Sequence, residues 1–190
     1  MDKKGQIIII SGPSGVGKTT LVNMLLKSVK NLSRCITYTT RKPRGNEKNG
    51  EDYWFVDDAA FSKLINDNEL AEWAVVNNHR YGTPKQGIER IVSSGMDAML
   101  VIDVNGAKSI KSQYPDSLSI FIEPPTMDTL KQRLEERGEQ DHVSMRLDRA
   151  KMELKENPNF DFTVINDNLD NAVDRLSKIM RLKKTEKSAK

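Results

Sequence analysis

The chain opens with an apolar run in which hydrophobic and polar residues do not alternate. Ile7 to Ile10 are four consecutive β-branched residues, a pattern typical of a strand buried on both faces, as in a parallel sheet. From Thr19 to Val29 the apolar residues recur at helical spacing instead. The opening segment therefore predicts a strand, a glycine-containing loop and a helix.

The same two patterns alternate through the second half of the chain. Short apolar runs predict buried strands over residues 99–102, 118–122 and 162–165. Segments with helical periodicity lie between or after them, at residues 107–113, 127–137, 143–155 and 171–182. Strands that alternate with helices indicate an α/β fold with a mostly parallel sheet flanked by helices.

Residues 33–95 have a different pattern. Strand-like pieces at 35–39 and 53–56 are separated by turn signals such as Asn49-Gly50, and most aromatic residues of the chain lie here. We interpret this segment as an inserted, mixed α+β substrate subdomain, with a helix over 84–92 that returns the chain to the core. The expected organisation is one domain with a core (1–32, 96–130 and 150–182), the subdomain (33–95), a helical lid (131–149) and a basic, disordered tail (183–190).

Composition narrows the class of protein. A length of 190 residues suits one compact domain, and 37% hydrophobic with 30% charged residues is typical of a globular protein. The net charge of +3 arises from nearly balanced acids and bases and does not indicate a nucleic-acid partner. The single cysteine, Cys35, excludes an internal disulfide and favours a reducing compartment. Because no apolar run approaches membrane-spanning length, we expect a cytoplasmic protein without a membrane partner.

A phosphate-binding motif follows the first predicted strand. Residues 12–19, GPSGVGKT, match G-x-x-x-x-G-K-[ST] and precede the predicted helix, which is the context that the motif requires. Glycines let backbone N–H groups turn around a phosphate, and the helix directs its positive end at the same anion. Lys18 is expected to bridge the β- and γ-phosphates, and the Thr19 hydroxyl to bind Mg²⁺. The predicted nucleotide-binding residues of this loop are Gly12, Ser14, Gly15, Val16, Gly17, Lys18, Thr19 and Thr20.

Two classes of P-loop protein compete for this motif. Asp103-Val104-Asn105-Gly106 imitates the D-x-x-G element of GTPases, but no Asn-Lys-x-Asp or Thr-Lys-x-Asp base-reading motif follows it. A small-molecule kinase needs a second anion site, and Arg41 and Arg44 could supply fork-shaped donors for an acceptor phosphate. Read alone, these arginines could equally belong to a solvated basic turn. The kinase interpretation is favoured by their presence in the same chain as a P-loop.

Seven segments together resemble the guanylate kinase family over nearly the whole chain. They are GPSGVGKTT at 12–20, TTRKPR at 39–44, GEDYWFV at 50–56, EWAVVNNHRYGT at 72–83, IDVNGAKSIK at 102–111, RLEERG at 133–138 and FDFTVIND at 160–167. Their order and spacing make the resemblance specific. It implies a P-loop NTPase core and phosphorylation of GMP by ATP to give GDP and ADP, with dGMP as a further acceptor, within purine nucleotide metabolism.

The resemblance also implies roles for particular residues. The GMP site would consist of Arg41, Arg44, Tyr53 and Tyr81 around the phosphate, and of Thr37, Glu72, Thr83 and Asp103 around the guanine. The Glu72 carboxylate suits guanine, because guanine presents N1–H and N2–H₂ donors whereas adenine presents an acceptor at N1. Arg133 and Asn166 would contact ATP, the catalytic residues would be Lys18, Arg41, Arg137 and Arg146, and Mg²⁺ would accompany the ATP. The partners would be ATP and GMP, and the chain would act as a monomer or homodimer.

Three positions depart from the family pattern. Val101 stands where the family usually has an acid, the lid between Arg137 and Arg146 is slightly shorter, and Gly45 lies one position early in its loop. Two alternatives follow. One is a related P-loop kinase that acts on another phosphomonoester, and the other is a catalytically silent, guanylate-kinase-like binding module. The second alternative is disfavoured because such modules typically lose the P-loop, which is intact here.

Overall fold

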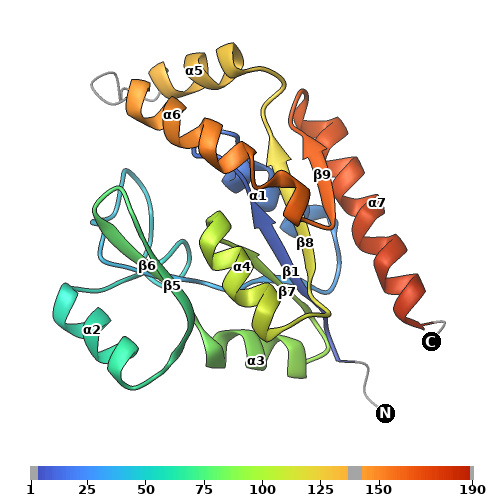
Figure 1. Ribbon diagram of the computed structural model, residues 1–190. Coiled ribbons are helices and arrows are strands. Elements are labelled where there is room, and N and C mark those ends of the chain that lie inside the picture. The colour runs from blue at the N-terminus through green and yellow to red at the C-terminus, as the bar shows by residue number, and fades with distance from the viewer. Residues whose placement is uncertain (1–3, 137–142, 189–190) are drawn as a thin grey trace. The chain divides into compact units, whose positions relative to one another are not determined.

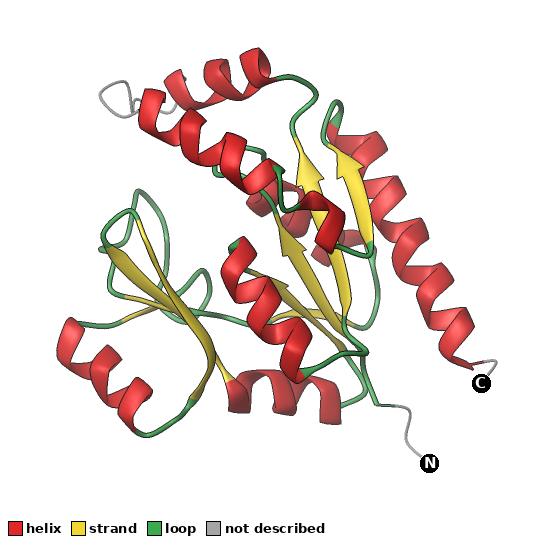
Figure 2. Ribbon diagram, in the orientation of Figure 1, coloured by secondary structure: helices red, strands yellow, loops and turns green. Residues whose placement is uncertain are grey.

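The computed structural model describes residues 4–136 and 143–188 (Figures 1 and 2). Its strands are β1 Ile7–Ser11, β2 Leu32–Arg34, β3 Tyr38–Thr39, β4 Trp54–Phe55, β5 Leu70–Val76, β6 His79–Pro84, β7 Asp97–Val101, β8 Leu118–Glu123 and β9 Phe162–Ile165. Its helices are α1 Lys18–Ser28, α2 Asp58–Asn66, α3 Lys85–Ser93, α4 Val104–Gln113, α5 Met127–Glu135, α6 Val143–Leu154 and α7 Leu169–Ser188, with a 3₁₀ turn, η2, at Asn157–Asn159.

The strands form two sheets. One has five strands in the order β2-β7-β1-β8-β9, and the other has four in the order β4-β3-β6-β5. In the five-stranded sheet β2 pairs with β7, and β8 with β9, in parallel. The predicted α/β fold with a parallel sheet is confirmed, and the predicted strands are present, each to within two residues at either end. The burial predicted for residues 162–165 is wrong: β9 is the last strand of the sheet order, only its Val164 is buried, and Ile165 is 43% exposed.

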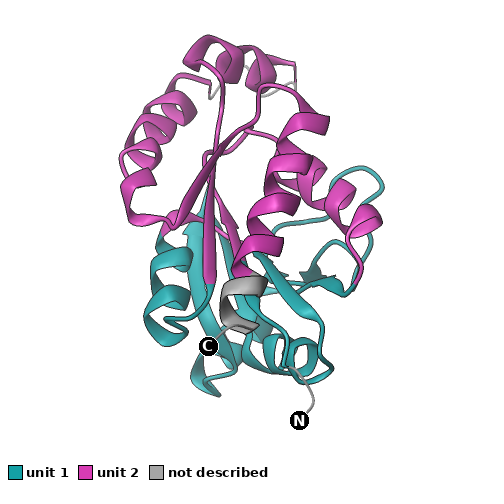
Figure 3. Cartoon of the chain, turned by 90° about the vertical axis from the view of Figure 1, so that its right-hand side faces the viewer, with its two compact units in different colours: residues 1–8, 31–100, 105–117 teal, residues 9–30, 101–104, 118–190 magenta. Residues whose placement is uncertain are grey.

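The chain divides into two compact units (Figure 3). Unit 1 comprises residues 1–8, 31–100 and 105–117, and unit 2 comprises residues 9–30, 101–104 and 118–190.

Unit 2 has a core of apolar strands and helix faces. Leu118, Ile120, Phe121 and Ile122 of β8 are all fully buried, which explains why the strand's sequence shows no alternation. Helix α7 packs against α1 and β9. Helices α5 and α6 pack together through a cluster of Leu130, Leu134, Val143 and Ala150, with Met127 and Leu147 at its edge.

Unit 1 contains a β-hairpin that the sequence analysis did not predict. Strands β5 and β6 pair in antiparallel fashion around Asn77 and Asn78, which both have positive φ, 50° and 63°. Two left-handed residues between paired strands are typical of a tight hairpin turn, and asparagine tolerates that conformation. Helix α2, also not predicted, is N-capped by the Asp57 carboxylate, which accepts a hydrogen bond from the Ala60 N–H at 2.7 Å. Its Phe61 side chain is fully buried.

Two further expectations need correction. The strand predicted over residues 35–39 is interrupted, because β2 ends at Arg34 and β3 begins at Tyr38. The tail from residue 183, expected to be disordered, continues α7 as far as Ser188. Its Lys, Thr, Glu and Ser residues are tolerated in a helix, and lengthening an existing helix requires no new nucleation.

Candidate active site

The phosphate loop lies between β1 and α1, in unit 2. The loop contains three glycines with positive φ: 138° at Gly12, 87° at Gly15 and 98° at Gly17. Residues other than glycine adopt such values only with backbone strain. Gly17 is also the N-cap of α1, so the loop leads directly into the positive end of that helix. The loop has the backbone conformation that the motif predicted.

The predicted loop residues differ in exposure. Gly12, Gly15 and Val16 are buried, whereas the side chains of Ser14, Thr19 and Thr20 are exposed. The Lys18 ammonium lies along the loop and donates to the carbonyl oxygens of Gly12 and Pro13, at 2.5 and 2.9 Å. The exposed Thr19 side chain lies in the first turn of α1.

Replacing Gly12 with alanine is expected to disrupt this loop. An added Cβ would lie 2.3 Å from the backbone oxygen of Ile122 in β8, and φ is positive. We expect the free energy of unfolding to fall by about 3 kcal/mol or more, because backbone must move and strain is added. Chemical denaturation measures this change.

Gly45→Ala is the matched control. Gly45 also has positive φ, 52°, but its added Cβ would meet nothing within 4 Å. Only the left-handed conformation is penalised there, by about 1 kcal/mol. Equal losses in the two variants would show that steric contact with Ile122 is unimportant.

Arg133 and Asn166 converge on the phosphate loop. The carbonyl oxygen of Val16 accepts from Asn166 Nδ2 at 2.7 Å and from Arg133 Nη1 at 3.4 Å. Arg133 Nη2 also donates to the Asn166 carbonyl oxygen at 3.2 Å. Asn166 is 2% exposed, and its buried Oδ1 has no hydrogen-bond partner within the described part of the chain. The two residues predicted to contact ATP therefore lie beside Val16 of the loop, and their contact with ATP stays a prediction.

The remaining unit 2 candidates lie on or near α6. Arg146 is half-buried on that helix, one turn before Arg149. Arg149 makes an ion pair with Glu153 at 2.9 Å and a longer one with Asp103 at 3.9 Å. Asp103, predicted to bind GMP, thus belongs to unit 2 and faces an arginine. Arg137 lies outside the described residues.

Unit 1 holds a cluster around the Arg41 guanidinium. Arg41 Nε donates to the Tyr81 hydroxyl at 3.2 Å, and its Cζ lies 5.3 Å from the centroid of the Tyr53 ring. The Tyr53 and Tyr81 rings meet edge to face at 6.0 Å. Burial raises the pKa of Tyr53, so its phenol keeps its proton and can donate to a phosphate. The structure thus brings together three of the four residues predicted to hold the acceptor phosphate.

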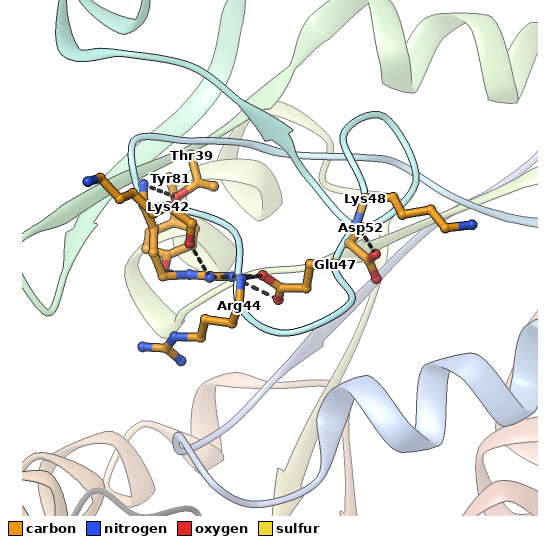
Figure 4. A network of polar contacts seen from close by, with 8 residues as sticks. Thr39, Lys42, Arg44, Glu47, Lys48, Asp52 and Tyr81 are labelled. Carbon is orange, nitrogen blue, oxygen red and sulfur yellow. Dashed lines mark hydrogen bonds and ion pairs between the residues drawn. The ribbon is translucent and has the colours of Figure 1, made fainter.

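Arg44, the fourth predicted phosphate ligand, is exposed on the same loop. In Figure 4 its side chain extends away from the Glu47 carboxylate. Its backbone N–H, however, donates to Glu47 Oε2 at 2.8 Å.

A second cluster in unit 1 surrounds Glu72. Glu72 and Thr83 pair across β5 and β6, and the Thr83 hydroxyl donates to Glu72 Oε1 at 2.5 Å. Glu72, Thr83 and Thr37 are 7%, 0% and 4% exposed. The pairing slips by one residue between Leu70 and Glu72, as in a β-bulge. Adjacent strand residues normally face opposite sides, and the bulge lets Ala71 and Glu72 both be buried.

The two clusters of unit 1 share strand β6. Tyr81 and Thr83 are two residues apart on this strand, so their side chains are on the same face, about 7 Å apart along it. A residue predicted to bind phosphate and a residue predicted to bind the base are thereby placed in one row.

The sequence analysis missed two charged residues of the Arg41 cluster. Glu47 makes an ion pair with Arg41 at 2.9 Å, and the Arg34 guanidinium lies 5.4 Å from the Tyr53 ring centroid. An acid three residues after Arg44 is a signal that could have suggested Glu47, whereas only the fold brings Arg34 to Tyr53.

Cys35 supplies no nucleophile, because burial raises the pKa of its thiol to about 12.

The residues at the phosphate loop fit a magnesium ion that arrives with a nucleotide. Thr19 offers a hydroxyl oxygen, and Mg²⁺ prefers oxygen ligands, including substrate phosphates and water. Among residues 4–136 and 143–188 there is no group of three or more His, Cys, Asp or Glu side chains arranged to hold a metal.

Within the same residues no helix is both long and apolar enough to cross a bilayer.

Comparisons with known proteins agree with this geometry. The sequence profile of the family described as "Guanylate kinase" matches residues 4–183. A guanylate kinase of Malacoplasma penetrans is 42% identical, with 98% of this chain and 97% of that protein covered. A guanylate kinase of Synechocystis is 41% identical, with 93% and 94% covered.

Solved structures resemble the fold as well. A crystal structure of guanylate kinase from Anaplasma phagocytophilum matches with a TM-score of 0.80 and 33% identity, covering 95% of this chain and 86% of that one. A shikimate kinase from Bacteroides thetaiotaomicron matches with a TM-score of 0.50 and 12% identity, covering 93% and 98%. The second match is a likeness of fold alone.

Proposed function

The chain belongs to the guanylate kinase family and is a kinase, and from this premise we propose that it transfers the γ-phosphoryl group of ATP to GMP. The products are ADP and GDP, and dGMP serves as a further acceptor. The observation that carries the choice of acceptor is the buried Glu72 carboxylate, hydrogen-bonded by Thr83. Guanine offers this carboxylate two N–H donors, and adenine cannot.

The proposed reaction needs no general base. The phosphate of GMP is already an anionic nucleophile, so catalysis consists of positioning and charge neutralisation. Arg41, Arg44, Tyr53 and Tyr81 hold the acceptor phosphate, and Thr37, Glu72, Thr83 and Asp103 hold the guanine. We retain the predicted division into a core, a GMP-binding subdomain (33–95) and a lid (131–149) as part of this proposal.

The phosphate loop, Arg133 and Asn166 hold ATP in this proposal. Lys18, Arg137 and Arg146 offset the charge on the transferring phosphoryl group. Mg²⁺, when bound, neutralises charge on the β- and γ-phosphates, and the Thr19 hydroxyl is the protein group that would hold it.

A coupled assay of ADP release tests the proposal. With ATP and Mg²⁺ present, we expect strong turnover with GMP, weaker turnover with dGMP, and little with AMP, CMP, UMP or IMP. Turnover of a different phosphomonoester in place of GMP would identify a related kinase. Binding of ATP without turnover on any acceptor would contradict the proposal and favour a binding module.

A further inference from the structure

The Glu47 carboxylate accepts hydrogen bonds from three N–H donors. They are Arg41 Nη1 and Nη2, each at 2.9 Å, and the backbone N–H of Arg44 at 2.8 Å (Figure 4). The Glu47 N–H in turn donates to the Arg44 carbonyl oxygen at 3.0 Å, which closes a tight turn. Glu47 therefore ties the side chain of Arg41 to the backbone of the loop that carries Arg44.

The remaining donors of Arg41 can be assigned one by one. A guanidinium has five N–H bonds. Nη1 uses both of its own, one to Glu47 and one to the Lys42 carbonyl oxygen at 2.7 Å. Nη2 uses one, to Glu47, and Nε donates to the Tyr81 hydroxyl at 3.2 Å. One Nη2–H is left.

That last donor lies on a defined edge of the guanidinium. Glu47 spans Nη1 and Nη2 and occupies the end of the group, and the Lys42 carbonyl occupies the Nη1 side. The outer N–H of Nη2 must then point along the same edge as Nε–H, because the group is planar. This edge also carries the Tyr81 hydroxyl, which accepts from Nε and can donate its own proton to an anion.

The Arg41 side chain is buried and keeps its positive charge. It is 7% exposed, whereas that of Glu47 is 25% exposed. Burial alone would lower the pKa of Arg41, but the hydrogen bonds that Arg41 donates to Glu47 and Tyr81 outweigh burial and raise the pKa. The guanidinium thus keeps its charge inside unit 1, in one orientation.

We propose that Glu47 is a positioning residue for the acceptor phosphate, because it holds Arg41 with the second Nη2–H beside the Tyr81 hydroxyl, so that both groups can donate to that phosphate. The inference rests on the proposed function, which makes Arg41 and Tyr81 ligands of the acceptor. In this proposal Glu47 acts through Arg41 and is not a ligand of the substrate. An Arg41 guanidinium that is already fixed before the anion binds loses less side-chain conformational entropy on binding.

Glu47→Gln tests the role. The side chain keeps its shape, but its amide nitrogen cannot accept from Arg41, so one charge-assisted hydrogen bond and the ionic attraction are lost. We expect the KM for GMP to rise about tenfold, because the binding free energy of one charged hydrogen bond corresponds to roughly a tenfold change in affinity. The kcat and the KM for ATP are expected to change by less than about threefold.

Glu51→Gln is the matched control on the same loop. Its side chain is 67% exposed and makes only a surface ion pair with Lys48, at 3.4 Å, which contributes little. The control should leave every constant unchanged. If Glu47→Gln raises the KM for GMP no more than Glu51→Gln does, the proposal is overturned. A fall in that KM would also overturn it and would show that Glu47 competes with the phosphate.

Two further measurements separate positioning from loop stability. In an Arg41→Lys background Glu47→Gln should have no additional effect on the KM for GMP, because the guanidinium that Glu47 orients is gone. The Nε–H NMR signal of Arg41, assigned by its loss in Arg41→Lys, should shift on titration of the wild-type protein with inorganic phosphate. In Glu47→Gln that shift should require about tenfold more phosphate; equal midpoints would refute the role. This measurement needs no GMP turnover, so it remains informative if the proposed function fails.

Discussion

Replacing Lys18 with methionine is expected to lower kcat at least about a thousandfold, or roughly 4 kcal/mol of transition-state stabilisation. Its ammonium donates to the carbonyl oxygens of Gly12 and Pro13, and in the proposed mechanism it is the loop's charged donor to the phosphates. Methionine has a comparable length without the charge. The loop backbone remains, so the KM for ATP should change much less than kcat. Steady-state kinetics with ATP and GMP measure both.

Lys27→Met is the control for this prediction. Lys27 is exposed in the last turn of the same helix, α1, far along the helix from the phosphate loop. Its replacement should leave kcat unchanged. A loss of less than tenfold in Lys18→Met would contradict the role assigned to Lys18 and would place the stabilising charge elsewhere in the chain.

Replacing Glu72 with glutamine is expected to lower kcat/KM for GMP by about 10²–10³-fold. The amide oxygen can still accept from the Thr83 hydroxyl, so the fold should persist. The new NH₂ group, however, cannot accept from the N–H donors of guanine, and a site with unpaired polar groups discriminates strongly. The ratio of kcat/KM for AMP to that for GMP should rise, because adenine N1 can accept from an amide.

Glu69→Gln provides the comparison. Glu69 is an exposed residue that directly precedes β5, and its replacement should change neither constant. Thermal unfolding of both variants checks that the fold is intact. If Glu72→Gln retained GMP activity within fivefold of the wild type, Glu72 would not be the base-reading residue, although the phosphate loop could still act.

The unpredicted elements of unit 1 show where sequence patterns fail. In β5 the residues Leu70, Ala71 and Glu72 are all buried, so the alternation that identifies a strand is lost at the bulge. The turn at Asn77 and Asn78 was a usable signal, since paired asparagines favour positive φ. The sequence around Glu72 gave no sign of burial, because a carboxylate in a strand is most often exposed.

The sequence by itself determined the features that depend on neighbours along the chain. The phosphate loop is contiguous, and its glycines, Lys18 and the following helix follow one another directly. Strand β9 was predicted with its observed bounds, Phe162–Ile165, because a run of aromatic and β-branched residues favours a strand.

Only the tertiary structure decided which distant polar groups meet. Thr83 reaches Glu72 across a hairpin, and Asn166 reaches Val16 from the position directly after β9. A hydrogen bond forms only within about 3 Å and in a suitable direction. Spacing along the chain does not fix that distance for residues in separate elements, so pairing and register had to bring these groups together.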